Sequence, residues 1–303
     1  MWSDTLRQGD VLNGRYEILG KLDKGGEAEI LIAWDLISQV KVAVKCQFPQ
    51  RFDSSATFEY RSRGIRREYR RLQALADIPG ITKVLDQGHV GGGNGGQFLV
   101  MEYVEGPTVK SWIKDHQPVP SVAAASVLAQ LCETLSHVHA KGYIHRDLTP
   151  GNVMVQPDGR VRLLDVGIAV RSGKLNCFPG GSPGYASPEQ YDRESKLTPQ
   201  VDVFALGAMW FEMTICELPY GGREGPPVPA EHPFPAGFPG GFGEGMRALG
   251  LAMVSHDPRD RPEGVGEVLR RLQPMLPVSG APASPKATKP DPTSYYRAGE
   301  SAK

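Results

Sequence analysis

The sequence predicts an α+β protein in which a small antiparallel sheet with one main helix precedes a larger, mostly helical part. Two observations support this prediction. Short runs of β-branched and other apolar residues, separated by turn residues, occupy residues 16–46 and indicate strands. After residue 106, apolar residues recur at helical spacing instead. The dipeptide Gly106–Pro107 marks the boundary, because glycine and proline interrupt regular structure.

Within the first part, the segments ILIAWD and KVAVKCQ are the clearest strands. Residues 58–76 are rich in Arg, Glu and Leu, and Ile65 and Leu72 lie on one side at helical spacing, which predicts a helix. Two further strands are expected at residues 82–90 and 97–104. The sequence GGGNGG between them favours a hairpin tip over a phosphate-binding loop, because no helix follows it.

The second part contains one long predicted helix, at about residues 121–141, with Val127, Leu131 and Leu135 among its apolar positions. Beyond residue 276 the composition changes to Pro, Ala, Ser, Thr and Lys. Such a segment has too few apolar side chains to offset the entropic cost of ordering, so we expect a disordered tail over residues 277–303.

Charge and cysteine usage narrow the class of protein. The 34 basic residues balance the 34 acidic residues, so no net charge attracts the molecule to nucleic acid. The cysteines are scattered, without zinc-site or disulfide-scaffold spacing, which fits reduced thiols and a cytoplasmic location. The N-terminal segment MWSDTLRQGD resembles no leader peptide, and the most apolar helix candidate carries Asp202 and Glu212. Neither secretion nor a membrane span is expected.

The stretch HRDLTPGNVMV, residues 145–155, contains the first candidate catalytic residues. Asp147 and Asn152 lie five positions apart, and a bent loop can bring them to one point. In a phosphoryl-transfer site, Asp147 would accept the proton of the substrate hydroxyl. Asn152 would hold Mg²⁺ together with a second acid, Asp165 in RLLDVGIAV. A polar turn and a strand-ending Asp are the alternatives that these residues leave open.

A second group of candidates lies in the sheet-rich part. The strand VAVK directs Lys45 opposite to Val44, and Glu68 in RREYRRL is a possible partner on the following helix. A surface lysine and an ion pair within a solvated helix are the alternatives. The segment LDKGGEAEI, residues 22–30, could approach phosphates through its glycine turn or form an ordinary hairpin.

Taken together, these motifs resemble the eukaryotic-like, or Hanks-type, Ser/Thr protein kinases found in bacteria. The match rests on His145-Arg146-Asp147 with Asn152, on the Asp165-Val166-Gly167 motif, and on the sequence GSPGYASPEQ from residue 181 to residue 190. The resemblance covers residues 16–276. It implies the two-lobed protein kinase fold, with an N-lobe at about 16–104, a C-lobe at about 105–276 and a short N-terminal extension, residues 1–15.

The resemblance also implies roles for individual residues. Asp147, Lys45, Glu68 and Arg146 match catalytic positions, and Asn152 and Asp165 match the Mg²⁺ ligands. The reaction implied is transfer of the γ-phosphoryl group of ATP to Ser or Thr hydroxyls of proteins, with autophosphorylation. The positions that match nucleotide contacts are Leu22, Gly25, Gly26, Ile30, Ala43, Lys45, Glu102, Val104 and Met154.

Further positions match the activation segment, residues 165–189, and its supports. Glu189 would pair with Arg261, and Asp202 would orient the backbone of the catalytic loop. Arg146 resembles the arginine that binds a phosphate on the activation segment, for which Ser172 is the candidate acceptor. Ser182 matches the position that contacts the catalytic Asp.

Four residues depart from the family pattern. Asp23 and Ala28 occupy the outer glycine positions, Thr149 stands where these kinases have a lysine, and Val166 replaces a phenylalanine. The incomplete glycine loop leaves a non-catalytic binding scaffold as an alternative. The H-x-D-x-x-x-x-N loop, which aminoglycoside and choline kinases share, leaves a small-molecule kinase as another.

Overall fold

The structure is a computed structural model that describes residues 6–24, 28–47, 55–90, 96–166, 169–177, 179–228, 232–234 and 243–299. The chain forms two compact units. The N-terminal unit comprises Met1–Asp77 and Ile81–Val104, and the C-terminal unit comprises Ile78–Gly80 and Glu105–Lys303. The division after Val104 lies two residues before the Gly106–Pro107 dipeptide.

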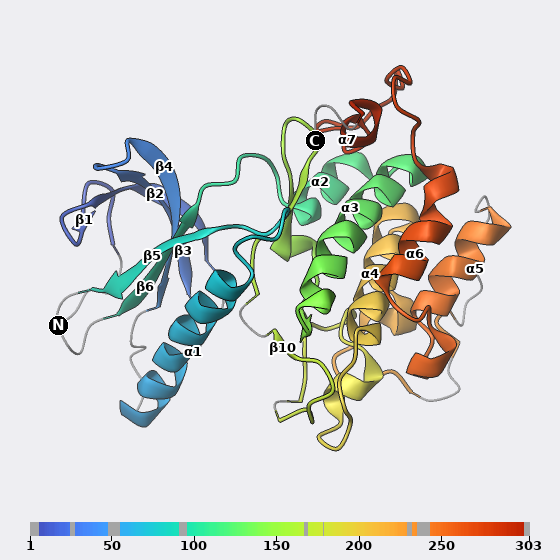
Figure 1. The fold of residues 1–303 in the computed structure, drawn as a ribbon, viewed down its shortest axis with the longest axis horizontal. Coiled ribbons are helices and arrows are strands. Elements are labelled where there is room, and N and C mark those ends of the chain that lie inside the picture. Colours follow the sequence, from blue (N-terminus) through green and yellow to red (C-terminus); the bar gives the residue numbers. More distant parts are fainter. Residues whose placement is uncertain are drawn as a thin grey trace. The chain divides into compact units, whose positions relative to one another are not determined.

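The N-terminal unit is an antiparallel sheet with the strand order β1-β2-β3-β4-β6-β5, accompanied by one helix (Figure 1). A sheet-rich part preceding a helical part is what the sequence predicts, and the α+β fold class is confirmed. The elements are β1 Val11–Leu12, β2 Tyr16–Lys24, β3 Glu29–Asp35, β4 Val40–Gln47, α1 Ser55–Ala74, β5 Val84–His89 and β6 Gln97–Glu102.

Alternation along β4 decides what each face of this sheet presents. Val42, Val44 and Cys46 are fully buried in the hydrophobic core of the unit. Ala43 and Lys45 point to the opposite face and are only partly buried. The lysine therefore projects from a rigid central strand, and its position follows from the burial of its neighbours.

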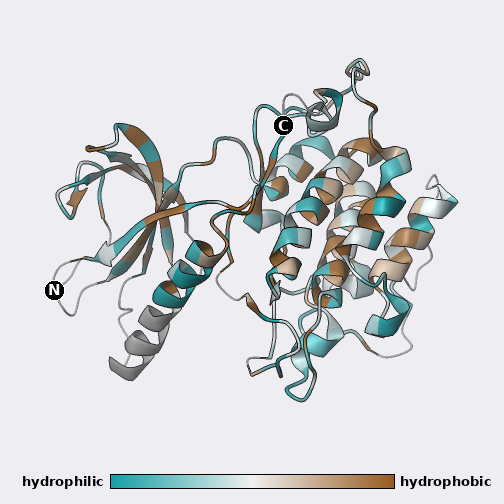
Figure 2. Ribbon diagram, in the orientation of Figure 1, coloured by the Kyte–Doolittle hydropathy of each residue, from teal (hydrophilic) through white to brown (hydrophobic). Residues whose placement is uncertain are grey.

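The C-terminal unit is built from helices around a core in which α4 is central (Figure 1). Nearly every residue of α4 is buried, whereas α6 carries both hydrophobic and hydrophilic residues, as the colours of Figure 2 show. The helices are α2 Val109–His116, α3 Ser121–Ala140, α4 Gln200–Ile215, α5 Glu244–Met253, α6 Val265–Leu272 and α7 Ser294–Arg297. Two two-stranded antiparallel sheets complete the unit: β7 Tyr143–Ile144 pairs with β10 Val170–Arg171, and β8 Val153–Val155 pairs with β9 Val161–Leu163.

Close packing of α4 against α5 depends on two glycines. A Cβ atom on Gly207 would lie 2.7 Å from the Cβ of Met253, and one on Gly250 would lie 2.6 Å from the ring of Phe211. Larger residues at either position would push the two helices apart.

No helix in the described part of the chain combines the length and apolar character needed to cross a membrane.

The prediction of a disordered tail is wrong for residues 277–299, here called the C-terminal strap. This segment returns from α6 to α2 (Figure 1). Trp112 Nε1 donates a hydrogen bond to Pro290 O at 3.0 Å, and Gln130 Nε2 donates to Pro292 O at 3.3 Å. The prediction from composition failed because it considered only the number of apolar side chains. The strap is held instead by hydrogen bonds that its backbone carbonyl groups accept from side chains of the helices.

Candidate active site

Lys45 of β4 and Glu68 of α1 form an ion pair within the N-terminal unit. The Lys45 Nζ atom lies 2.9 Å from Glu68 Oε1 and 2.8 Å from Glu68 Oε2. Glu68 is buried, and an acidic residue is rarely buried without a partner. The contact proposed from the sequence is thus present, and it holds the ammonium group at a defined place on the sheet.

The residues predicted to surround a nucleotide base are divided between the two units. Ile30 pairs in register with Lys45, so it lies on the same face of the sheet. Ala43 pairs with Met101 of β6. The others in this unit are Leu22 on β2, Glu102 at the end of β6, and Val104. Met154 lies on β8 of the C-terminal unit, and Gly25 and Gly26 lie outside the described residues.

Asp202, near the start of α4, holds the backbone of the loop that contains His145 and Arg146. Its Oδ2 accepts a hydrogen bond from the backbone N–H of His145, and its Oδ1 accepts one from that of Arg146, each at 2.9 Å. His139 Nε2 lies 2.7 Å from Oδ2. Burial by itself would raise the pKa of the Asp202 carboxyl, but the hydrogen bond with His139 and the other bonds lower it on balance. Asp202 is therefore a buried, charged anchor.

Asp147 lies in the loop that Asp202 anchors, and two side chains fix its carboxylate. Ser182 Oγ donates to Asp147 Oδ1 at 2.6 Å, and Asn152 Nδ2 donates to Asp147 Oδ2 at 3.2 Å. The same Nδ2 also donates to the backbone carbonyl of Asp147 at 2.9 Å. A carboxylate has about four lone-pair sites, so Asp147 can still accept a hydrogen bond from a hydroxyl group.

Asn152 and Asp165 are suited to a magnesium ion by the chemistry of their atoms. The Asn152 side chain uses its nitrogen for Asp147, which leaves its oxygen as the atom able to face a cation. Leu164 N donates to Asn152 O at 2.9 Å, which ties Asn152 to the residue before Asp165. Mg²⁺ prefers such oxygen ligands and completes its shell with phosphate oxygens and water. The described residues include no cluster of three His, Cys, Asp or Glu side chains that could hold a metal alone.

The end of the activation segment is anchored by a bidentate ion pair. Arg261 Nη1 and Nη2 lie 2.7 Å and 3.0 Å from the two carboxylate oxygens of Glu189. The Arg261 side chain is fully buried and also donates to the carbonyl oxygens of Ser255, Gln200 and His256. This pairing, which the sequence predicted, links the segment to the loop before α6.

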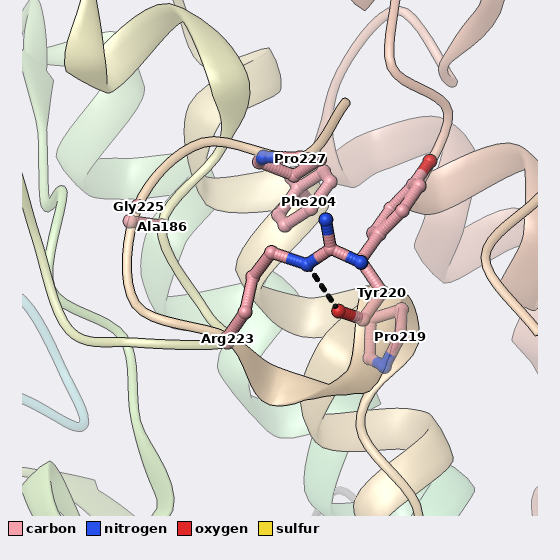
Figure 3. Close-up of a pocket in the computed structure, with 8 residues that line it drawn as sticks. Ala186, Phe204, Pro219, Tyr220, Arg223, Gly225 and Pro227 are labelled. Atoms are coloured by element: carbon pink, nitrogen blue, oxygen red, sulfur yellow. Dashed lines mark hydrogen bonds between the residues drawn. The ribbon is translucent and has the colours of Figure 1, made fainter. Parts of the chain in front are cut away.

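The residues just before Glu189 pack tightly against α4. Tyr185 donates a hydrogen bond to Glu212 at 2.5 Å, and burial raises the pKa of the Glu212 carboxyl. Ala186 and Phe204 help to line a cavity of about 10 Å³, where Arg223 Nε donates to Tyr220 O (Figure 3). The cavity has room for about one water molecule.

Sequence reasoning missed three polar side chains that take part in this region. His139 contacts Asp202, while Asn176 and Gln190 contact Arg146. None stands at a distinctive spacing from the catalytic motifs. Only Gln190 had a local signal, because it directly follows the Ser-Pro-Glu motif.

Comparison with known proteins identifies the family. Residues 16–231 match the protein kinase domain family. This chain is a member of the protein kinase family. The resemblance predicted from the motifs is confirmed. The match ends before α5 and α6. Leu249 and Val268 of these two helices nevertheless belong to the same hydrophobic core as the residues of α3 and α4.

Two curated relatives show the nature of the similarity. The chain is 32% identical over 228 residues to the serine/threonine-protein kinase PrkC of Bacillus subtilis (strain 168). That alignment covers 74% of this chain and 34% of PrkC. This chain is also 31% identical over 269 residues to the serine/threonine-protein kinase PknB of Mycobacterium tuberculosis. That alignment covers 85% of this chain and 42% of PknB. The chain thus spans less than half the length of either relative.

Proposed function

We propose that this protein is an ATP-dependent kinase that phosphorylates Ser and Thr residues of proteins, itself included. The observation that carries the proposal is the arrangement around Asp147. Its carboxylate is held by Ser182 and Asn152, and its loop is held by Asp202. The serine/threonine kinase names of the two relatives agree with it.

Asp147 is the residue that receives the substrate proton. As the substrate hydroxyl oxygen forms a bond to the γ-phosphorus, its proton passes to an oxygen of Asp147. The bond between the γ-phosphorus and the oxygen that bridges to the β-phosphate breaks, and ADP leaves. Lys45, held by Glu68, neutralises charge on the α- and β-phosphates.

Asn152 and Asp165 are the residues that would hold magnesium. A bound Mg²⁺ would neutralise charge that develops on the phosphate oxygens. We assign contacts with the adenine base of ATP to Leu22, Ile30, Ala43, Glu102, Val104 and Met154. Gly25 and Gly26 remain proposed contacts of the phosphates.

The test is transfer of labelled phosphate from ATP, with Mg²⁺, to a generic basic protein. The wild-type protein should label the substrate, and Asp147→Asn should reduce kcat by about 10²- to 10⁴-fold. The matched control is Asp158→Asn, because Asp158 has an exposed carboxylate in the turn between β8 and β9. This variant should retain the wild-type rate.

Two other outcomes would replace the proposal. Nucleotide binding without transfer, and with no difference between wild type and Asp147→Asn, would indicate a binding scaffold. Transfer to choline or an aminoglycoside, with no labelling of protein, would indicate a small-molecule kinase. Mass spectrometry of the protein expressed with and without an intact Asp147 would identify the residues that it phosphorylates on itself.

A further inference from the structure

Three buried residues form a closed ring of hydrogen bonds next to Asp147, through their side chains and two backbone carbonyl groups. Arg146 Nη2 donates to Asn176 Oδ1 at 3.1 Å, and Asn176 Nδ2 donates to Gln190 O at 2.7 Å. Gln190 Nε2 then donates back to Arg146 O at 2.9 Å. The ring connects the catalytic loop, the middle of the activation segment and the residue that follows this segment.

Burial makes each bond of the ring important. Arg146, Asn176 and Gln190 are 5%, 1% and 0% exposed. Water therefore has little access to replace a lost partner, and an unsatisfied buried polar group is costly. A broken bond in the ring would leave a buried polar group without its partner.

The ring also supports an unusual backbone conformation. Arg146 has φ of +73°, in the left-handed region that is unfavourable for a residue with a side chain. Its N–H is bound by Asp202, its carbonyl by Gln190 and its guanidinium by Asn176. Because Asp147 is the next residue, a change in the Arg146 backbone would move the catalytic carboxylate.

The place occupied by Asn176 requires both an acceptor and a donor. Its oxygen faces the Arg146 guanidinium, whereas its nitrogen faces two carbonyl oxygens, Gln190 O at 2.7 Å and Asp192 O at 3.2 Å. The opposite orientation of the amide would direct its NH₂ group at a guanidinium that can only donate. A carboxylate or phosphate at this point would direct acceptors at the two carbonyl groups. An uncharged amide fits this place, and an anion does not.

We propose that Asn176 is a positioning residue that holds Arg146, and through it Asp147, in the catalytic conformation without phosphorylation of the activation segment. The inference rests on the proposed kinase function and specifies its regulation. Ser172, the acceptor expected from the sequence, is exposed, and its backbone N–H binds Gly142 O. Its hydroxyl takes no part in the ring.

The main experiment compares the full chain before and after treatment with a protein phosphatase, with intact mass recording the phosphate content. Dephosphorylated wild type and Ser172→Ala should keep kcat within about twofold of the untreated protein. Asn176→Ala should lower kcat about tenfold, in line with the loss of buried hydrogen bonds, and leave KM for ATP within about twofold. Cys177→Ala is the matched control, because this neighbouring side chain is exposed, and it should match wild type.

Two further variants separate positioning from general structural support. Asn176→Asp keeps an acceptor for Arg146 but loses the donor, so its kcat should stay near that of Asn176→Ala. Arg146→Ala combined with Asn176→Ala should be no slower than the Arg146→Ala single variant, because both changes open the same ring. Wild-type kcat in Asn176→Ala, or a tenfold loss on dephosphorylation of the wild type, would overturn the proposal. Full activity in Asn176→Asp would also overturn it, because an anion would then suffice at this place.

Hydrogen–deuterium exchange of the amides of residues 172–192 gives a readout that does not depend on activity. Exchange should be faster in Asn176→Ala than in wild type and unchanged in Cys177→Ala. An inactive wild type would overturn the kinase function and with it any catalytic role of Asn176, while the exchange data would still show whether Asn176 holds the segment. Unchanged exchange in Asn176→Ala would overturn the inference even in an active kinase.

Discussion

Two sets of polar contacts in the C-terminal unit differ in how far water can replace them. The first, the buried network, consists of the contacts of Asp202, Arg146, Asn176, Gln190 and Arg261, all of which are buried. The second consists of the contacts that the C-terminal strap makes through its two tyrosines. Its Tyr295 and Tyr296 donate to Glu133 at 3.1 Å and 3.0 Å from partly exposed positions.

The difference shows where this fold depends on single residues. A buried charge that loses its partner has no substitute, whereas water can bind a half-exposed group in place of a lost one. Tyr295 lies in an environment between fully buried and fully exposed. Burial and the nearby Glu133 raise the pKa of its hydroxyl to about 12. We therefore expect large losses from single changes in the network and small losses from single changes in the strap.

The largest effect is expected from Arg261→Ala, which leaves the Glu189 carboxylate without its ion-pair partner. The free energy of unfolding should fall by about 3 to 5 kcal/mol, as for other broken buried pairs. Chemical denaturation monitored by circular dichroism measures the change. The matched control is Arg259→Ala, two residues away, because Arg259 pairs with Asp257 at the surface. Equal losses in the two variants would contradict the comparison.

The second largest effect is expected from Asp202→Asn. The free energy of unfolding should fall by about 3 kcal/mol at neutral pH, because two backbone N–H groups lose a charged acceptor. The lowered pKa of Asp202 makes this loss depend on pH. The ionised carboxylate stabilises the fold above its ordinary pKa of 3.8, and this contribution disappears as pH falls through the lower folded-state pKa. The difference between wild type and variant should therefore shrink in acid.

Denaturation at a series of pH values from 7 downward tests that dependence. Asp115→Asn serves as the control, because Asp115 is exposed on α2 and its replacement should change stability little at any pH. A difference between wild type and Asp202→Asn that stays constant into acid would show that Asp202 does not act through its charge.

A chain that ends at Leu276 lacks the strap. Its free energy of unfolding should fall by less than that of Arg261→Ala or Asp202→Asn. The strap contributes several neutral hydrogen bonds, partly offset by the entropy that its release regains, so we expect a loss of about 2 kcal/mol. Thermal unfolding should show a decrease in Tm of about 5 °C. Phosphoryl transfer should continue at the wild-type rate, and a large loss of kcat would show that the strap supports catalysis.

The smallest effect is expected from Tyr296→Phe. This change removes one of the two hydroxyl groups that donate to Glu133, and Tyr295 and water remain as donors. The loss should be about 0.5 to 1 kcal/mol by chemical denaturation. Tyr295→Phe should cause a similar loss. A loss of several kcal/mol would place the strap in the same class as the buried network.

Local sequence patterns were sufficient for the elements that carry the main catalytic candidates. Alternation placed Lys45 opposite the buried Val44, and helical spacing placed Glu68 on the following helix. Motif order was sufficient for the pairing of Glu189 with Arg261. These features could be predicted because each depends on neighbours in the chain or on a family pattern.

Other features could not be predicted, because their partners lie far apart in the chain. Asn176 contacts Arg146 across 30 positions, and Gln190 contacts Arg146 across 44. The strap was predicted to be disordered from its composition, although residues such as Trp112 and Gln130 bind its carbonyl groups. A prediction from composition considers side chains only. It does not include hydrogen bonds that the backbone accepts from donors elsewhere in the fold.

The sequence by itself determined the fold class, the order of the catalytic motifs and the family, because periodicity and residue spacing are properties of the chain alone. Tertiary structure decided how Arg146 is held and whether residues 277–299 pack against the helices. Both outcomes depend on whether buried donors and acceptors from distant segments meet, and packing rather than residue order controls those meetings.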